Sequence, residues 1–324
     1  MRRTLSSASV QRGFHLLVAL TALLGVAASC GSGGSSPPVQ RPAFDAQRAF
    51  ADLEAQVQMG PRAPGTQGHA DIVAWITNAL GQQAAQVTTQ QFKSETALGP
   101  PGHEYDFTNI MGQFSGVGGP EVLAVGAHFD TRPVADQDPD PAKRTDPVPG
   151  ANDGASGVAV LLEIARALKA QTPPRPVLLI FFDAEDSGLS SAPPPYYGFC
   201  LGSQYLAANM GGARIDKLIL LDMIGDESLA IPKEVNSQNA APQLLDAVFG
   251  AARRLGHSAF EDRTGPRMVD DHLPFIDRGI PAIDLIDFDY PYWHTTSDVP
   301  AHCRADSLRQ VGDTLLEVIY ADVW

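Results

Sequence analysis

Four continuous apolar runs, each leading into a histidine or a carboxylate, constrain the fold of this chain more than any other feature. The runs and the polar residues after them are 122–127 with His128, 177–182 with Glu185 and Asp186, 218–221 with Asp222, and 282–286 with His294 further on. Apolar runs without alternation are typical of strands that helices cover on both faces. We therefore predict a single α/β domain with a mostly parallel or mixed central sheet and helices on both faces.

The remaining elements follow from residue patterns between these runs. Helical spacing of apolar residues predicts helices near 43–59, 68–80, 156–170, 202–210, 241–255 and 305–321. Residues 87–92 and 108–113 have the character of two further strands. No internal repeat is visible in the sequence.

The polar residues after the apolar runs are candidates for a shared site. In open sheets of this kind the ligand site lies beyond the carboxyl ends of the strands, so we expect these side chains at one rim. Each alone has an ordinary explanation, because an aspartate after a strand often caps a turn and a lone histidine is often a packing residue. Several in a fixed order are harder to explain in this way. Catalytic zinc takes about three histidine or carboxylate ligands, so the set predicts a zinc site.

Two segments carry most of this prediction. Residues 150–157, Gly-Ala-Asn-Asp-Gly-Ala-Ser-Gly, combine small residues that permit close backbone approach and start a helix with Asp153 at the tip of the loop. An anion-binding glycine loop is disfavoured, because an aspartate occupies its centre. Glu185 and Asp186 are adjacent after a strand, so in an extended geometry their side chains point in different directions. One of these two side chains can then bind metal, while Glu185 serves as general base and acid. The alternative interpretation is that both residues belong to a solvated acidic turn.

The first residues have a different character. Arg2, Arg3 and Arg12 precede an apolar stretch, 16–28, that ends in small residues at Cys30. This pattern predicts a secretory leader over 1–29, with 27–30 resembling a lipoprotein cleavage box and Cys30 as the lipidated residue. Ordinary signal cleavage and a retained membrane helix are the alternatives. Residues 30–41 are rich in Gly, Ser and Pro and predict a flexible tether before a catalytic domain at 42–324.

These features define the expected location and partners. We expect an exported protein, either a membrane-anchored lipoprotein or a periplasmic or extracellular one. The formal net charge of −14 disfavours nucleic acid and anionic surfaces as partners, so membrane contact is expected only through a lipid at Cys30. Cys200 and Cys303 are the cysteines of the folded part, and an oxidising compartment permits but does not require that they pair.

The ordered motifs also carry a family resemblance. They are His128-Phe129-Asp130, residues 152–157, Phe182-Asp183-Ala184-Glu185-Asp186, residues 221–225 and Trp293-His294-Thr295. The chain resembles the zinc aminopeptidase superfamily from about residue 44 to 324, and within it the animal-type glutaminyl-peptide cyclotransferases, or glutaminyl cyclases, that some bacteria also carry. Residues 270–275, Asp-Asp-His-Leu-Pro-Phe, and Trp293 directly before His294 favour the cyclase branch.

This resemblance implies a function and a set of roles. Zinc would be bound by Asp153, Asp186 and His294, Glu185 would be the general acid and base, and Asp222 and Asp270 would form an acidic hydrogen-bonding network beside it. Trp293 would pack on the substrate side chain. The expected reaction converts the N-terminal glutamine of peptides or proteins to pyroglutamate with release of ammonia, and one zinc ion suffices for it.

The chain departs from the animal enzymes at three places. It has Glu185-Asp186 where they have two glutamates, so the predicted ligand is one methylene shorter. The loop 187–197 has no tryptophan for the pocket wall, so Tyr196, Tyr197 or Phe199 are the expected substitutes. Ala127 stands where the animal enzymes have a cysteine. These departures concern the substrate pocket more than the metal site.

Two other functions are consistent with parts of the sequence. In a dizinc aminopeptidase, His128 and Asp222 would bind a second metal ion and a bridging hydroxide would attack a peptide bond. In a catalytically silent surface binding module, a ligand or Glu185 would be lost, and none is. Trp293 and the segment around Asp270 decide for the cyclase. The sequence leaves open whether the Asp- and Pro-rich loop 131–149 covers the site.

Overall fold

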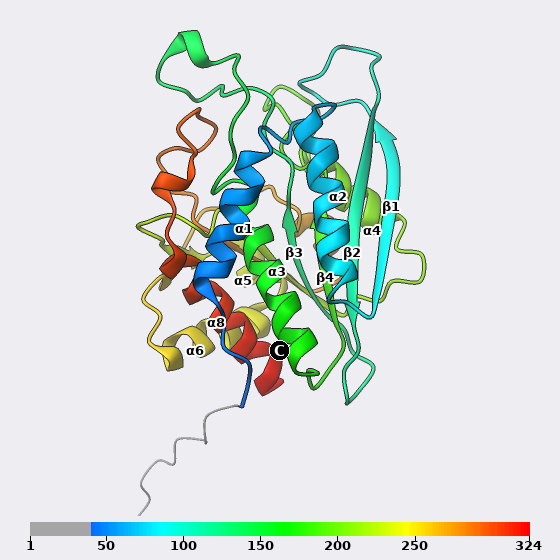
Figure 1. Cartoon of the computed structure of the whole chain (residues 1–324), viewed down its shortest axis with the longest axis vertical. Coiled ribbons are helices and arrows are strands. Elements are labelled where there is room, and N and C mark those ends of the chain that lie inside the picture. The colour runs from blue at the N-terminus through cyan, green and yellow to red at the C-terminus, as the bar shows by residue number, and fades with distance from the viewer. Residues whose placement is uncertain (1–39) are drawn as a thin grey trace, which may run out of the picture. The chain divides into compact units, whose positions relative to one another are not determined.

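The computed structural model describes residues 40–324. The predicted leader at 1–29, the lipidation of Cys30 and all but the last two residues of the predicted tether lie outside the described residues and stay predictions. The described part is built on a six-stranded sheet with the order β1-β2-β4-β3-β5-β8. Figure 1 shows this sheet behind a layer of helices, with the carboxyl end of β3 directed towards the upper part of the view.

The sheet is mixed, as the apolar runs predict. Four strands are parallel: β4 (Val177–Phe182), β3 (Leu123–His128), β5 (Lys217–Asp222) and β8 (Ala282–Ile286). Two antiparallel strands extend the sheet beyond β4: β2 (Tyr105–Phe114) and, at the edge, β1 (Gln86–Ser94). The parallel strands therefore place their carboxyl ends at one rim.

Alternate residues of the central strands enter two different cores. One core packs Val125, Leu179 and Ile219 against five helices: α1 (Ala46–Gln58), α2 (Gln67–Gly81), α3 (Ala155–Ala170), α6 (Pro242–Leu255) and α8 (Ala305–Ala321). The other core packs Ala124, Leu178 and Leu218 against α4 (Leu201–Ala208) and α7 (Leu273–Ile276). Since both faces are covered, the strands need apolar residues at every position, which explains the continuous runs. The predicted fold class is confirmed.

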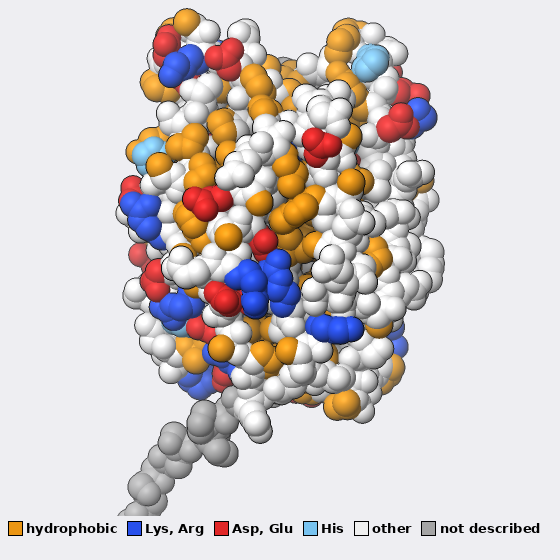
Figure 2. Space-filling model, viewed as in Figure 1, with side chains coloured by type: hydrophobic (Ala, Val, Ile, Leu, Met, Phe, Trp, Pro, Cys, Tyr) orange, Lys and Arg blue, Asp and Glu red, His pale blue; other side chains and the backbone are white. Residues whose placement is uncertain are grey.

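Helix α1 begins at a side-chain cap and is joined to α3 by an ion pair. The carboxylate of Asp45 accepts a hydrogen bond from the backbone N–H of Arg48 at the start of α1. Arg48 of α1 also lies 2.6 Å from Glu163 of α3. Figure 2 shows this helical face, on which basic and acidic side chains lie next to one another among apolar ones.

Several short elements have no counterpart in the sequence prediction. They are the two-stranded parallel sheet of β6 (Ile231–Lys233) and β7 (Phe260–Thr264), the helices α5 (Val235–Ala240) and α7, and the 3-10 turns η1 (Pro141–Lys143) and η2 (Pro300–His302). Such short segments carry too few residues for a periodic pattern. None of the helices within residues 40–324 combines the length and the apolar character that a membrane span needs. Cys200 and Cys303 are both buried and free.

Candidate active site

A cavity of about 340 Å³ lies at the rim where the parallel strands end. Its lining includes most of the residues that the sequence predicts for the site: Asp153, Glu185, Asp186, Asp222, Asp270, Trp293 and His294. His128, at the end of β3, lies directly behind this lining, with its Nε2 atom 3.2 Å from Asp153 and 3.1 Å from Asp222. The structure thus brings all the predicted residues together.

Asp153, Asp186 and His294 form one compact donor group, called here the cavity group. Nε2 of His294 lies 3.2 Å from Asp186 Oδ1 and 3.7 Å from Asp153 Oδ2. Two donors on one tetrahedral zinc ion lie roughly 3.3 Å apart, given zinc–donor bonds of about 2.0–2.1 Å. Oδ2 of Asp153 and Oδ2 of Asp186 are buried without a hydrogen-bond partner among the described residues. Buried carboxylate oxygens of this kind need a cation or a proton, so the cavity group fits a divalent metal ion.

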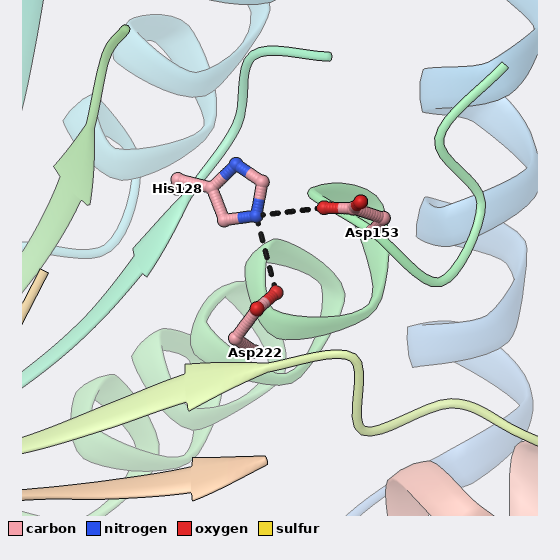
Figure 3. Close-up of side chains that lie close together, drawn as sticks. All are labelled: His128, Asp153 and Asp222. Carbon is pink, nitrogen blue, oxygen red and sulfur yellow. Dashed lines mark hydrogen bonds and ion pairs between the residues drawn. The ribbon is translucent and has the colours of Figure 1, made fainter. Parts of the chain in front are cut away.

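A second donor group shares Asp153 with the first. It consists of His128, Asp153 and Asp222, whose donor atoms lie close enough together for one ion. Figure 3 shows a single nitrogen of the His128 ring directed at both carboxylates. Because Asp153 contacts His128 through Oδ1 and faces His294 with Oδ2, the arrangement provides donors for one metal ion or for two ions bridged by Asp153.

The backbone after β4 turns sharply and separates Glu185 from Asp186. Ala184 has a φ of 56°, a left-handed conformation that is costly for a residue with a side chain. The backbone N–H groups of Glu185 and Asp186 both donate to the carboxylate of Asp130, over 2.9 and 3.1 Å. Asp186 then faces His294, while Glu185 faces Cys200, whose thiol donates to Glu185 Oε1 over 3.5 Å. The two side chains point in different directions, as predicted, but Asp130 and the turn hold them there rather than an extended strand.

Glu185 lies in an environment that favours its neutral form. Burial raises the pKa of Glu185 well above its ordinary value; the charge of His128 opposes this, while the carboxylates of Asp186 and Asp270 add to it. A carboxyl group with a raised pKa can accept and return a proton near neutral pH. Glu185 is 9% exposed and lines the cavity, so it can reach a bound molecule.

The loop that carries Asp153 is fixed in the same manner as the one that carries Glu185. The carboxylate of Asp298 accepts hydrogen bonds from the backbone N–H of Asn152 at 2.8 Å and of Asp153 at 3.1 Å. Gly154, with a φ of 99°, then starts α3. A Cβ atom at Gly157 would lie 2.6 Å from the carbonyl oxygen of Leu221. The small residues therefore permit close approach of α3 to β5, which confirms the predicted role of this loop.

Asp222 and Asp270 interact through charge, and their hydrogen bonds go elsewhere. Within residues 40–324 the hydrogen bond of Asp222 is to His128, and that of Asp270 is from the backbone N–H of Asp271 over 2.6 Å. Burial raises the pKa of Asp270 to about 7, and the charge of Asp222 adds to this shift. Asp270 belongs to a deeper cluster with His272 and Asp284, called here the inner group, whose donor atoms also lie within 4.8 Å of one another.

Aromatic side chains form the apolar wall of the cavity. The ring of Trp293 stacks on His294 with centroids 3.7 Å apart, and Phe288 meets Trp293 edge-on at 5.0 Å. Tyr197 and Phe199 also line the cavity. Tyr196 does not line it, because its hydroxyl donates to Asp277 over 2.5 Å. Of the three predicted substitutes for a pocket tryptophan, the structure therefore places Tyr197 and Phe199 at the wall.

The sequence prediction misses two residues that lie beside the cavity group. Arg132 donates to Asp186 over 3.0 Å and makes two hydrogen bonds to Asp136, and all three residues line the cavity. Both belong to the loop 131–149, which therefore contributes part of the cavity wall. A signal was present: an arginine follows a strand-end motif in an acidic site, where a guanidinium is expected to pair with carboxylates.

Comparison with known proteins relates this site to characterised ones. Residues 109–319 match Peptidase family M28. The solved structure of a glutaminyl cyclase from Bacteroides thetaiotaomicron bound to N-acetylhistamine is 38% identical, with a TM-score of 0.80, and covers 87% of this chain and 99% of that one. A Zn-dependent exopeptidase from Parabacteroides distasonis is 36% identical, with a TM-score of 0.81 and the same coverage. An aminopeptidase of Bacillus subtilis is 25% identical over 85% of this chain, and the chain spans 56% of its length.

These similarities confirm the resemblance that the motifs indicate, to the zinc aminopeptidase superfamily and its glutaminyl cyclases. They also identify the chain as an enzyme, as the sequence predicts. The family match covers well over half of the 324 residues and includes every residue of the cavity group. This chain belongs to peptidase family M28.

Proposed function

We propose that this chain is a glutaminyl-peptide cyclotransferase, which converts the N-terminal glutamine of peptides or proteins to pyroglutamate and releases ammonia. The observation that carries the proposal is the stacking of Trp293 on His294, at 3.7 Å, in the wall of a small cavity next to Glu185. A cavity of about 340 Å³ accommodates one amino-acid side chain and its backbone, with the rest of a peptide left outside. The likeness to a glutaminyl cyclase at 38% identity supports the same reading.

The proposed metal is one zinc ion, held by Asp153, Asp186 and His294. An ion bound there would supply Lewis-acid polarisation of the γ-carbonyl of the glutamine side chain. The fit of the three donors and the likeness to a Zn-dependent exopeptidase support zinc. His128 and Asp222, which bond to each other over 3.1 Å, then orient Asp153 from behind.

Glu185 moves the proton in this reaction. As the bond between the α-amine nitrogen and the γ-carbonyl carbon forms, Glu185 accepts a proton from the amine. As the bond from that carbon to the amide nitrogen breaks, Glu185 returns the proton to the departing ammonia. No water molecule is consumed, so the amine and the carbonyl must be held together, which Trp293 and the cavity wall provide. The raised pKa of Glu185 suits both transfers.

The remaining proposals concern location. A leader at 1–29, lipidation at Cys30 and a tether to 41 would place the enzyme outside the cytoplasm, anchored to a membrane or released, with access to peptides that begin with glutamine. These proposals rest on the sequence pattern alone.

A dizinc aminopeptidase is the second candidate. The observation that favours it is the second donor group, in which Nε2 of His128 lies 3.1 Å from Asp222 and 3.2 Å from Asp153. With a second metal ion in that group, hydrolysis of a peptide bond becomes feasible. The similarity to an aminopeptidase of Bacillus subtilis supports this alternative.

Mass spectrometry of one peptide separates these functions. The purified domain, loaded with zinc, is incubated with a peptide that begins with glutamine, and the Glu185→Gln variant serves as the matched control. Loss of ammonia from the intact peptide supports cyclisation. Release of free glutamine supports the peptidase and overturns the cyclase. An unchanged peptide overturns both and leaves the silent surface binding module.

A further inference from the structure

Arg132 is a buried cation at the edge of the cavity group. Its side chain is only 3% exposed. Nε and Nη2 of Arg132 donate to the two carboxylate oxygens of Asp136 over 2.8 and 2.7 Å, and Nη1 donates to Asp186 Oδ1 over 3.0 Å. The guanidinium also lies 5.6 Å from the centre of the Phe199 ring. Three charge-assisted hydrogen bonds and a ring contact fix the orientation of this side chain.

Arg132 leaves one oxygen of Asp186 available. Because Nη1 of Arg132 occupies Oδ1, the carboxylate of Asp186 cannot rotate freely about its terminal bond. Oδ2 of the same carboxylate is buried and has no hydrogen-bond partner among the described residues. The same contact fixes the direction of Oδ1, which lies 3.2 Å from Nε2 of His294, and it leaves Oδ2 as a buried unpaired acceptor that a cation would satisfy.

Asp136 extends the same chain of contacts to His294. Oδ1 of Asp136 lies 3.5 Å from Nδ1 of His294. An acceptor on that side of the ring favours the tautomer with its proton on Nδ1. The lone pair of Nε2 is then free to bind a metal ion. The loop is also tied to the histidine by its backbone, since the N–H of Gln137 donates to the carbonyl of His294 over 3.2 Å.

The order of contacts is therefore Asp186, Arg132, Asp136, His294, and it links two members of the cavity group that come from different strand ends. The third member, Asp153, is oriented separately by Asp298. The opposite charges of Arg132 and Asp136 nearly cancel, because the two side chains are joined by two hydrogen bonds. The pair therefore changes the electrostatic potential at the cavity group little and acts mainly on the orientation of Asp186 and His294.

We propose that Arg132 and Asp136 are positioning residues, a linked pair that orients Asp186 and His294 towards one zinc ion and thereby sets the affinity of the site for zinc. This inference rests on the proposed metal site, and it holds for cyclisation and for peptide hydrolysis alike. Outer-shell partners of this kind typically change metal affinity by roughly 10- to 100-fold.

The main test is Arg132→Lys, because lysine keeps the positive charge but cannot bridge two carboxylates in a fixed plane. Zinc affinity of the metal-free protein is measured by competition with a chelator, and the visible spectrum of the cobalt-substituted protein reports the geometry around the metal. We expect roughly tenfold or greater weakening of zinc binding and a changed cobalt spectrum. Arg214→Lys is the matched control, since Arg214 makes the same two-bond contact with Asp216 at the surface, over 2.7 and 2.9 Å.

A second variant is needed in case a substitution at the buried Arg132 prevents folding. Asp136→Asn keeps the shape of the side chain and removes its charge. We expect this variant also to weaken zinc binding and to change the cobalt spectrum. Its metal-free form should unfold near the unfolding temperature of the unsubstituted protein. Zinc affinity within about twofold and an unchanged cobalt spectrum in both variants overturn the inference, whatever the peptide assay shows. If the unsubstituted protein binds no zinc, the inference and the proposed metal site fail together. If it binds zinc and hydrolyses the peptide, only the cyclase proposal fails.

Discussion

The cavity group and the inner group contain the same residue types at similar burial, yet the structure treats them differently. In the cavity group, Asp153 and Asp186 each have one buried oxygen without a hydrogen-bond partner among the described residues, and both side chains line the cavity together with His294. In the inner group, His272 and Asp284 are fully buried and do not line the cavity, and both oxygens of Asp284 lack a partner among the described residues. All three members of the cavity group line the cavity, whereas of the three inner-group residues only Asp270 does.

The two groups also differ in how their charge is compensated. Two aspartates on fixed loops, Asp130 and Asp298, hold the backbone of the cavity group, and Arg132 holds Asp186 from the side. Among residues 40–324, no arginine or lysine pairs with the inner group: burial raises the pKa of Asp284 well above its ordinary value, and the nearby charge of Asp270 adds to the shift. The cavity group thus fits a metal ion, whereas the inner group, two members of which lie behind the cavity wall, fits protons.

Removing one carboxylate from each group tests this difference directly. Asp153→Ala should abolish zinc binding and activity, because Asp153 belongs to both donor groups; the loss should exceed the roughly 10- to 100-fold typical of outer-shell changes. Asp284→Asn, at an equally buried carboxylate, should retain one equivalent of zinc. Elemental analysis of the two purified proteins measures this. Equal zinc content in both would show that the cavity group is not the metal site.

The acid–base role of Glu185 is the next largest effect. Glu185→Gln should keep zinc, since Glu185 is not a member of the cavity group, and lower kcat by roughly 10²- to 10⁴-fold, as is typical when a general acid–base group is lost. Single-turnover rates and zinc content are measured on the same samples. Cys200→Ser, which alters the only thiol that bonds to Glu185 in the described residues, is the control for small packing changes. Turnover near that of the unsubstituted enzyme would exclude Glu185 as the proton carrier.

Sequence patterns predicted those parts of the fold and site that depend on local order in the chain. The apolar runs give the four parallel strands, because a strand covered on both faces cannot alternate. His128 and Asp222 are the last residues of β3 and β5, so the parallel sheet alone brings them together. Asp153 was predictable from the small residues around it, which allow α3 to approach β5.

The rest depends on contacts between segments that are distant in the sequence. Nothing in the local sequence shows that Asp130 binds the backbone of Glu185, or that Asp298 binds the loop around Asp153, 145 positions away. Arg132 lies in a loop without periodicity, and its partner Asp186 comes from another strand end. The direction of hydrogen bonds at Asp222 and Asp270 was also not predictable, because both face several acceptors and donors at once.

Trp293 tests whether the cavity wall acts on substrate or only on the metal ligand beside it. Trp293→Ala should raise KM by about 2- to 10-fold, the effect expected when an aromatic contact worth about 0.5–1.5 kcal/mol is lost, with a smaller change in kcat. Trp293→Phe should recover most of the affinity. Tyr196→Phe is the control, because its hydroxyl bonds to Asp277 outside the cavity. If Trp293→Ala lowers zinc affinity and leaves KM unchanged, the ring serves His294 and not the substrate.

The smallest expected effect concerns the protons of the inner group. Asp284 has a raised pKa in the folded protein, so between its unfolded value of about 3.9 and its higher folded value, folding requires proton uptake and stability falls as pH rises. Asp284→Asn needs no proton. Its unfolding temperature, relative to that of the unsubstituted protein, should therefore be higher at pH 8 than at pH 5, by about 2–4 °C for each 1 kcal/mol of difference.

Asp289→Asn, at a carboxylate that is 83% exposed on the same segment, should show no such dependence on pH. Scanning calorimetry of the three zinc-free proteins at the two pH values provides the comparison. The zinc-free form is needed because bound zinc would stabilise the folded state by mass action and mask a difference of this size. A shift for Asp284→Asn that is the same at both pH values would mean that Asp284 is ionised in the folded protein. The inner group would then need a cation as the cavity group does, and access to the cavity would not be what distinguishes the two.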